Sequence, residues 1–428
     1  MKFYVSAAQA SEQTIAIVPV MADQLEQYLD SKSKAHADWV KATGFTGAAR
    51  QLCHMPGEAG QLETILLGLG AELDFDIIAF VPHKLHEGNY HFDLQYQALS
   101  SDDQQMLYLS WGLGCYRFEA YKECKGELPR LRLPEEIDRE SLERWLSSIS
   151  LGRDLINTPC CDMGPADLED AVKHVAAECD AEVTVIVGED LVTQNYPAIY
   201  AVGKGAQIPP RLIDLTWGAA DAPKITLVGK GVCFDTGGLN LKPRMGMRSM
   251  KKDMGGAAAV LALSRMIMLE QWPVRLRLLI PAVENAIDNK SYRPDDVVQT
   301  RAGITVEIDN TDAEGRMVLS DALFEACSES PDYVVDFATL TGARNVALGP
   351  DICAVFSNHH ELAANIQNAS WKEHDPLWQM PLHAKYMESL KSTIADCVNS
   401  GPVAGCITAA LFLQQFVSKE VKWIHVDT

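Results

Sequence analysis

Two acidic clusters and the lysines beside them carry the clearest chemical signal in the sequence. The first cluster lies in residues 227–260, LVGKGVCFDTGGLNLKPRMGMRSMKKDMGGAAAV. Lys230 ends an apolar run typical of a β-strand, and Asp235, Lys242 and Asp253 follow at intervals of five, seven and eleven residues. A Gly-Gly pair follows each aspartate closely and would allow close approach to the backbone. An apolar helix is predicted directly after Asp253, which would leave the cluster partly shielded from water.

The second cluster lies in residues 304–323, ITVEIDNTDAEGRMVLSDAL. Asp312, Glu314 and Arg316 alternate after a predicted strand, so an extended backbone would point all three side chains the same way. The acidic residues also have an ordinary interpretation, because Asp253 could cap the following helix and Asp312 could form an Asx-turn. The convergence of four carboxylates and two lysines near strand ends favours a binding site over that interpretation.

Four carboxylates in one place repel one another, and their pKa values rise unless cations neutralise them. Divalent metal ions are the natural counter-charges. A cluster of Asp and Glu without His or Cys favours Mn, Mg or Zn. Two such ions, about 3.5–4 Å apart and bridged by shared carboxylates, commonly activate one water molecule for hydrolysis. The residues therefore predict a two-metal hydrolytic site.

These segments closely resemble the leucine aminopeptidase (cytosol aminopeptidase) family. The resemblance covers about residues 150–428, and the sequence NTDAEGR is its most specific part. The short amino-terminal region is more similar to the peptidase B branch of the family. The segments that carry the resemblance are VGKGVCFDTGG (228–238), MKKDMGGAAAV (250–260), NTDAEGRMVLSDAL (310–323), INTP (156–159), ATLTGA (338–343) and WIHVD (423–427).

The resemblance implies a metalloprotease that hydrolyses the N-terminal residue from short peptides with a free N-terminus. It also implies two divalent metal ions, manganese or zinc with magnesium as a further candidate, and a bound bicarbonate. One metal would be held by Lys230, Asp235, Asp253 and Glu314, and the other by Asp235, Asp312 and Glu314.

The resemblance assigns the remaining roles residue by residue. Lys242 would polarise the scissile carbonyl and stabilise the oxyanion. Arg316, with backbone near Leu340, would hold the bicarbonate that accepts a proton from the attacking water. The residues that would line the substrate pocket are Met250, Asn310, Thr339 and Gly342.

The family continues beyond the WIHVD landmark, whereas this sequence ends at Thr428. The resemblance leaves open whether a tail has been lost or the chain is a short form. In both cases we expect an altered pocket wall and an unchanged set of metal ligands.

The elements that must position these residues form two predicted domains. In the second domain, alternating strands and helices predict a mainly parallel sheet flanked by helices. The predicted metal site would lie beyond the carboxyl ends of its strands. The resemblance implies a smaller, macro-like α/β domain before this catalytic α/β domain. The predicted limits are residues 1–133, a linking amphipathic helix at 134–157, and residues 158–428. Within the first domain, the apolar runs 76–83 and 106–114 are expected to be strands.

Bulk properties narrow the possible partners and location. The 428 residues exceed one ordinary core, and a net charge of −21 repels phosphates, so nucleic acid is not an expected partner. A DNA-binding accessory protein, a second role within the family, is kept as the alternative function.

The 11 cysteines lack a C-x-x-C pair, which indicates reduced thiols. Neither residues 1–13 nor the longest apolar run, 254–269, fits a signal peptide or a membrane span. We therefore expect a cytoplasmic homohexamer without a membrane partner.

Overall fold

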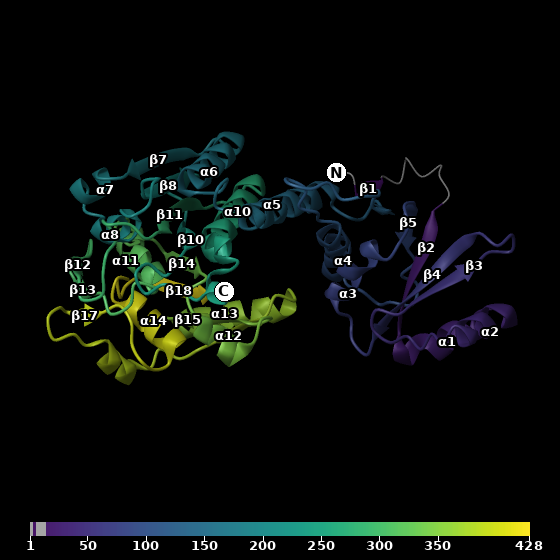
Figure 1. Ribbon diagram of the computed structural model, residues 1–428. Helices are drawn as coiled ribbons and strands as arrows, with labels where there is room; N and C mark the ends of the chain where they lie inside the picture. The colour runs from purple at the N-terminus through teal and green to yellow at the C-terminus, as the bar shows by residue number, and fades with distance from the viewer. Residues whose placement is uncertain (1–2, 6–13) are drawn as a thin grey trace. The chain divides into compact units, whose positions relative to one another are not determined.

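The chain forms two compact units, Met1–Ser150 and Leu151–Thr428 (Figure 1). The computed structural model describes residues 3–5 and 14–428, so most of the segment tested for a signal peptide lies outside the described residues. Among the helices in the described ranges, none has the length and apolar character needed to cross a bilayer. A small α/β unit followed by a larger one with a mainly parallel sheet confirms the predicted fold class.

The first unit is built on a six-stranded sheet in which all neighbouring strands are parallel except β3 and β4. In spatial order the strands are β1 (Tyr4–Val5), β6 (Arg130–Arg132), β5 (Asn89–Phe92), β2 (Ile15–Met21), β4 (Leu62–Gly70) and β3 (Leu52–Pro56). The helices of this unit are α1 (Leu25–Asp30), α2 (Lys34–Ala42), α3 (Phe75–Phe80) and α4 (Ser101–Gly114).

Two predicted strands of this unit are helices. The apolar runs 76–83 and 106–114 lie largely in α3 and α4. Each helix begins at a capping residue: the Asp74 carboxylate accepts the backbone N–H of Asp76, and the Ser100 hydroxyl accepts that of Asp103. A continuous apolar run fits a buried helix as well as a buried strand, and the caps decide between them.

The second unit contains a nine-stranded sheet whose centre is parallel. In spatial order its strands are β16 (Leu377–Gln379), β15 (Cys353–Ser357), β18 (Lys422–Asp427), β14 (Tyr333–Ala338), β9 (Lys224–Gly229), β11 (Arg275–Asn285), β8 (Arg211–Trp217) and β7 (Glu182–Val187), and β10 (Gly231–Asp235) also pairs with β11. A small second sheet contains β12 (Val297–Gln299), β13 (Thr305–Glu307) and β17 (Cys397–Val398).

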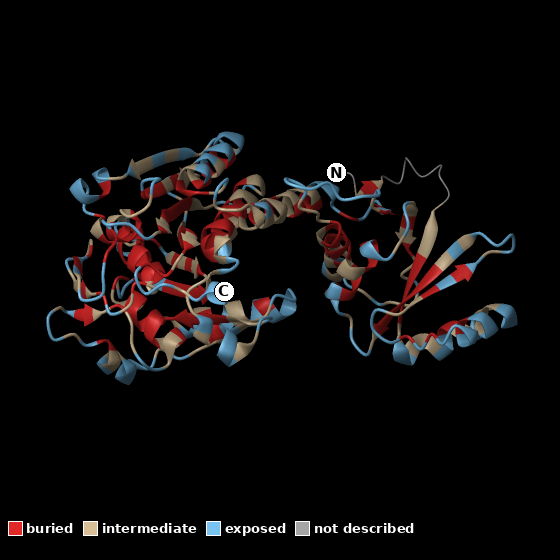
Figure 2. Ribbon diagram, in the orientation of Figure 1, coloured by how far each residue is buried: buried red, intermediate tan, exposed pale blue. Residues whose placement is uncertain are grey.

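Helices cover both faces of the large sheet. On β11, Leu276, Leu278 and Ile280 pack with α6 and α10, whereas Leu279 and Val283 pack with α8 and α11. Helix α11 is buried along nearly its whole length (Figure 2). The helices of this unit are α6 (Pro165–Cys179), α7 (Asp190–Thr193), α8 (Pro197–Gly203), α9 (Arg244–Met247), α10 (Gly255–Leu269), α11 (Glu314–Ala326), α12 (Gly342–Leu348), α13 (His360–Lys372) and α14 (Gly405–Gln414).

The predicted linking helix is present but begins later than expected. It is α5 (Arg139–Asn157), which crosses the limit between the two units. The backbone N–H of Ser141 donates to the Asp138 carboxylate over 3.0 Å, as expected of an N-cap. Residues 134–138 therefore precede the helix. The domain limits drawn from the sequence remain predictions.

Candidate metal centre

One cavity of about 400 Å³ in the second unit is lined by every residue that the sequence assigns to a site. These residues are Lys230, Asp235, Lys242, Met250, Asp253, Asn310, Asp312, Glu314, Arg316, Thr339, Leu340 and Gly342. The structure thus brings together residues up to about a hundred positions apart in the chain. Their individual roles remain predictions.

The ends of parallel strands position the first part of the cluster. Lys230 directly follows β9, and Asp235 is the last residue of β10. Asp253 lies in a short 3-10 helix, η4 (Met250–Met254), that leads into α10. All three are buried, with 2–4% of their surface exposed.

The second part of the cluster is positioned differently from the sequence prediction. Glu314 and Arg316 do not alternate on an extended segment with Asp312, because both lie in the first turn of α11. Asp312 comes two residues before that helix, and its backbone N–H donates to the Asn310 side chain over 2.9 Å. A turn followed by a helix start therefore brings these side chains into the cavity, and the predicted extended backbone is wrong.

The Lys230 ammonium joins two of the carboxylates. Its Nζ lies 2.8 Å from Asp253 Oδ1 and 2.9 Å from Glu314 Oε1, and it donates to the Thr339 carbonyl over 2.9 Å. Burial by itself lowers the pKa of Lys230, but the neighbouring carboxylates outweigh burial and raise the pKa well above its usual range. Gly315 leaves room for this lysine, since a Cβ there would lie 2.6 Å from Lys230 Cε.

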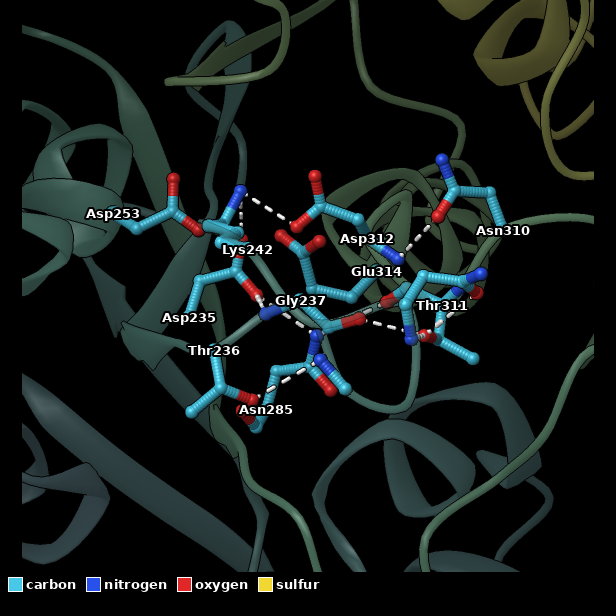
Figure 3. Close-up of polar contacts among 12 residues, drawn as sticks. Asp235, Thr236, Gly237, Lys242, Asp253, Asn285, Asn310, Thr311, Asp312 and Glu314 are labelled. Atoms are coloured by element: carbon cyan, nitrogen blue, oxygen red, sulfur yellow. Dashed lines mark hydrogen bonds and ion pairs between the residues drawn. The ribbon is translucent and has the colours of Figure 1, made fainter. Parts of the chain in front are cut away.

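The Lys242 ammonium joins the other two carboxylates (Figure 3). Its Nζ lies 2.9 Å from Asp235 Oδ2 and 2.6 Å from Asp312 Oδ1. Burial lowers the pKa of Lys242, and the adjacent carboxylates reverse that effect and raise it. The four carboxylates are thus held in two pairs, each pair with one lysine.

The donor set fits divalent cations. Oxygen atoms of Asp235, Asp312 and Glu314 all lie within 4.8 Å of one another, close enough to share an ion. Asp253 Oδ2 is buried and has no hydrogen-bond partner among the described residues. Burial raises the pKa of Asp253 well above its usual range and that of Asp312 to about 6. Carboxylates that resist ionisation in this way would be stabilised by added positive charge.

A supporting layer that the sequence analysis missed orients Asp235. Asn285 Nδ2 donates to Asp235 Oδ1 over 2.8 Å and to the Thr311 carbonyl over 3.0 Å, and it is almost fully buried. The Tyr292 hydroxyl donates to the same Thr311 carbonyl, and the Gly237 backbone N–H donates to Asp235 Oδ1. Asn285 ends β11 at the carboxyl edge of the sheet, which is the signal that could have identified it.

A second supporting group comes from the WIHVD landmark. The buried Asp427 carboxylate accepts the backbone N–H groups of Leu340 and Thr341 over 3.0 and 3.1 Å, and also the Thr341 hydroxyl. This bond fixes the segment from which the Thr339 hydroxyl donates to Asp253 Oδ1 over 2.8 Å. Asp427 therefore holds in place the backbone segment whose Thr339 contacts the proposed metal ligand Asp253. It also accepts the Leu340 N–H, which belongs to the backbone region predicted to help hold bicarbonate.

Arg316 is a buried cation with donor capacity to spare. Its Nη1 donates to the Asn399 carbonyl over 2.7 Å, whereas its Nε has no hydrogen-bond partner among the described residues. Burial lowers the pKa of Arg316 to about 10. A buried, unpaired N–H on a guanidinium is a donor for an anion, so this residue fits the bicarbonate predicted there.

Comparisons with known proteins agree over most of the chain. Residues 150–428 match the profile of the catalytic domain of the cytosol aminopeptidase family, and residues 15–134 match the profile of the M17 aminopeptidase N-terminal domain. A probable cytosol aminopeptidase from Syntrophotalea carbinolica is 42% identical over 332 residues, which cover 74% of this chain and 67% of the relative.

Solved structures extend this similarity to the fold. A cytosol aminopeptidase from Coxiella burnetii superimposes with a TM-score of 0.93 at 50% identity, covering 99% of this chain and 92% of the other. The bottromycin maturation enzyme BotP in complex with Mn has a TM-score of 0.87 at 31% identity, covering 97% of this chain and 92% of the other.

The contact between Asn285 and Asp235 generates the first prediction. We expect Asn285→Ala to weaken Mn²⁺ binding by about 10- to 100-fold, the usual effect of losing a group that orients a metal ligand. Isothermal titration calorimetry with Mn²⁺ measures this, and circular dichroism reports whether the fold is kept. Asn345→Ala is the matched control, because Asn345 is exposed and lines the same cavity. Equal Mn²⁺ affinity in the two variants would contradict the orienting role.

Proposed function

Because the chain belongs to the cytosol aminopeptidase family, we propose that it removes the N-terminal residue from short peptides in a metal-dependent reaction. The members of this family are peptidases of the leucyl aminopeptidase type, so the chain is an enzyme of that class. One observation carries the proposal: four carboxylates and two lysines from separate strands, helices and loops meet in a single cavity.

The proposed ligand sets follow the resemblance. One ion would be held by Lys230, Asp235, Asp253 and Glu314, and the other by Asp235, Asp312 and Glu314. Manganese is supported by the relative whose structure is a complex with Mn, and zinc and magnesium remain candidates on donor chemistry. Bound there, two divalent cations would acidify a water molecule, polarise the scissile carbonyl and anchor the peptide's free α-amino group.

The chain's own side chains supply the rest of the chemistry. Lys242, from a loop beside Asp235 and Asp312, would place its ammonium near the oxygen that gains negative charge during attack. When a cation binds, Lys230 would release a proton to water and would remain next to Asp253 and Glu314 as a neutral amine. Arg316 would hold a bicarbonate through its unpartnered Nε, which would put a proton acceptor beside the site.

The end of a substrate peptide would enter the cavity that holds the proposed metal ligands. Met250, Thr339, Gly342 and Asn310 line this cavity, and the Asn310 side chain accepts the backbone N–H of Asp312. A cavity volume of about 400 Å³ suits a residue or two of a peptide rather than a folded protein.

The proposed setting is a cytoplasmic homohexamer. All 11 cysteines are free thiols, in keeping with a reducing compartment. The alternative function, a DNA-binding accessory protein, gains no support from the names of the relatives, and the charge of −21 opposes it.

The metal ligands generate a direct test. We expect Asp235→Asn and Glu314→Gln to lose bound metal and aminopeptidase activity together, because both residues would contact both ions. Metal content by atomic emission and hydrolysis of leucine p-nitroanilide after Mn²⁺ loading measure the two losses. Glu361→Gln, an exposed carboxylate on α13, is the control. Retained Mn²⁺ and full activity in the two site variants would refute the ligand assignment.

The role of Lys242 can be separated from metal binding. We expect Lys242→Ala to lower kcat by about 10²–10³, the usual loss for a group that stabilises an oxyanion, with metal content unchanged. Steady-state kinetics together with metal analysis of the same preparation check this. Loss of metal in the variant would instead place Lys242 among the ligands.

The proposed assembly is tested by mass. Six chains of 47.0 kDa should give a hexamer in multi-angle light scattering. A strict monomer that cleaves short peptides and folded proteins equally well would overturn the proposed hexamer.

A further inference from the structure

The cavity contains one lysine that the ligand and oxyanion assignments do not use. Lys230 and Lys242 each contact two carboxylates, and the Arg316 guanidinium donates to a backbone carbonyl. Lys252 lines the same cavity, is exposed to it, and has no carboxylate within ion-pair distance among the described residues. It is therefore a cation in the site whose charge is available to a ligand.

The backbone holds Lys252 in a defined place beside the candidate metal ligands. It lies in η4, directly before Asp253, and its backbone N–H donates to the Ser249 carbonyl over 3.0 Å. Ser249 has a left-handed backbone (φ 73°) that turns the chain into this short helix. Successive residues of a 3-10 helix point about 120° apart, so neighbouring side chains diverge.

The neighbouring lysine shows that divergence. The Lys251 ammonium donates to the Asn157 carbonyl, at the end of α5, and Lys251 does not line the cavity. Met250, which lies one 3-10 turn before Asp253 and therefore on the same face, does line it. The helix thus presents Met250, Lys252 and Asp253 to the cavity and anchors Lys251 elsewhere.

Charge balance indicates what Lys252 would attract. If two divalent ions bind, their charge offsets that of the four carboxylates, and the remaining cationic side chains leave the cavity positive. Lys252 is exposed, so its ammonium would attract a carboxylate through a partly screened interaction, which adds to the positive charge of the metal-loaded cavity. The protein as a whole is acidic at −21, so this preference must be local.

We propose that Lys252 is a specificity-determining residue that favours peptides presenting a carboxylate close to the scissile bond. The inference rests on the proposed aminopeptidase function and adds a substrate class to it. The carboxylate could come from an N-terminal Glu or Asp side chain, or from the free C-terminus of a dipeptide. Both would reach the same ammonium, and substrates can be chosen to separate them.

The experiment compares two substrate pairs with the Mn²⁺-loaded enzyme. Glutamyl and glutaminyl p-nitroanilides differ in the side-chain carboxylate and lack a C-terminal one. Leu-Leu and Leu-Leu-amide differ in the C-terminal carboxylate. For each pair the ratio of kcat/KM, charged over neutral, is measured in the wild type, Lys252→Met and Lys252→Arg.

We expect Lys252→Met to lower the ratio of at least one pair by about 5- to 30-fold, and the affected pair identifies the source of the carboxylate. Lys252→Arg should keep most of the ratio, because it keeps the charge. Raising the ionic strength should lower the wild-type ratio and leave that of Lys252→Met nearly constant. Lys290→Met is the matched control, since it removes an exposed lysine of the same unit that does not line the cavity.

Two outcomes overturn the proposal. One is a Lys252→Met enzyme with both ratios unchanged, and the other is an equal fall in Lys290→Met. A loaded wild type that cleaves none of the four substrates would refute the proposed aminopeptidase function itself. Hydrolysis of the neutral substrates without a Lys252 effect would refute this inference alone.

Discussion

The mutual repulsion of four carboxylates in one cavity, three of them almost fully buried, is the constraint on which the rest of the structure depends. Such charges cannot share a low-dielectric site unless cations lie between them. Lys230 and Lys242 meet that need by pairing the carboxylates two by two. The same excess of oxygen donors, including an unpartnered oxygen of Asp253, makes the cavity suited to divalent ions.

The parallel sheet supplies the rigidity that this arrangement requires. Strands β9, β10 and β11 end at the same edge, so Lys230, Asp235 and Asn285 are delivered together. Helix α11 begins at that edge with Glu314 and is buried along its length, so the carboxylate cannot move away without disturbing the core. Asp427, at the end of β18, fixes the Leu340–Thr341 backbone in the same way. The positions of the proposed ligands are thus set by strands and a helix that pack into the hydrophobic core of the second unit.

Much of the fold was predictable, and the two failures in the first unit share one cause. The alternation of strands and helices after residue 157 matched the observed elements because sheets and helices differ there in period and length. In the first unit, the runs at 76–83 and 106–114 are apolar without clear periodicity, and both became helices. Their capping residues, Asp74 and Ser100, carry the information that decides for a helix.

The sequence by itself determined the chemistry of the site: which residue types are present, their spacing around Lys230 and Asp235, and the family they indicate. Only the tertiary structure decided how they meet. It placed Glu314 at a helix start rather than on an extended segment, and it brought Asn285 and Asp427 behind the ligands. A sequence motif shows only residue types and their spacing within a short segment. Which hydrogen-bond donor faces a given carboxylate depends on strand order and helix packing, which no local pattern encodes.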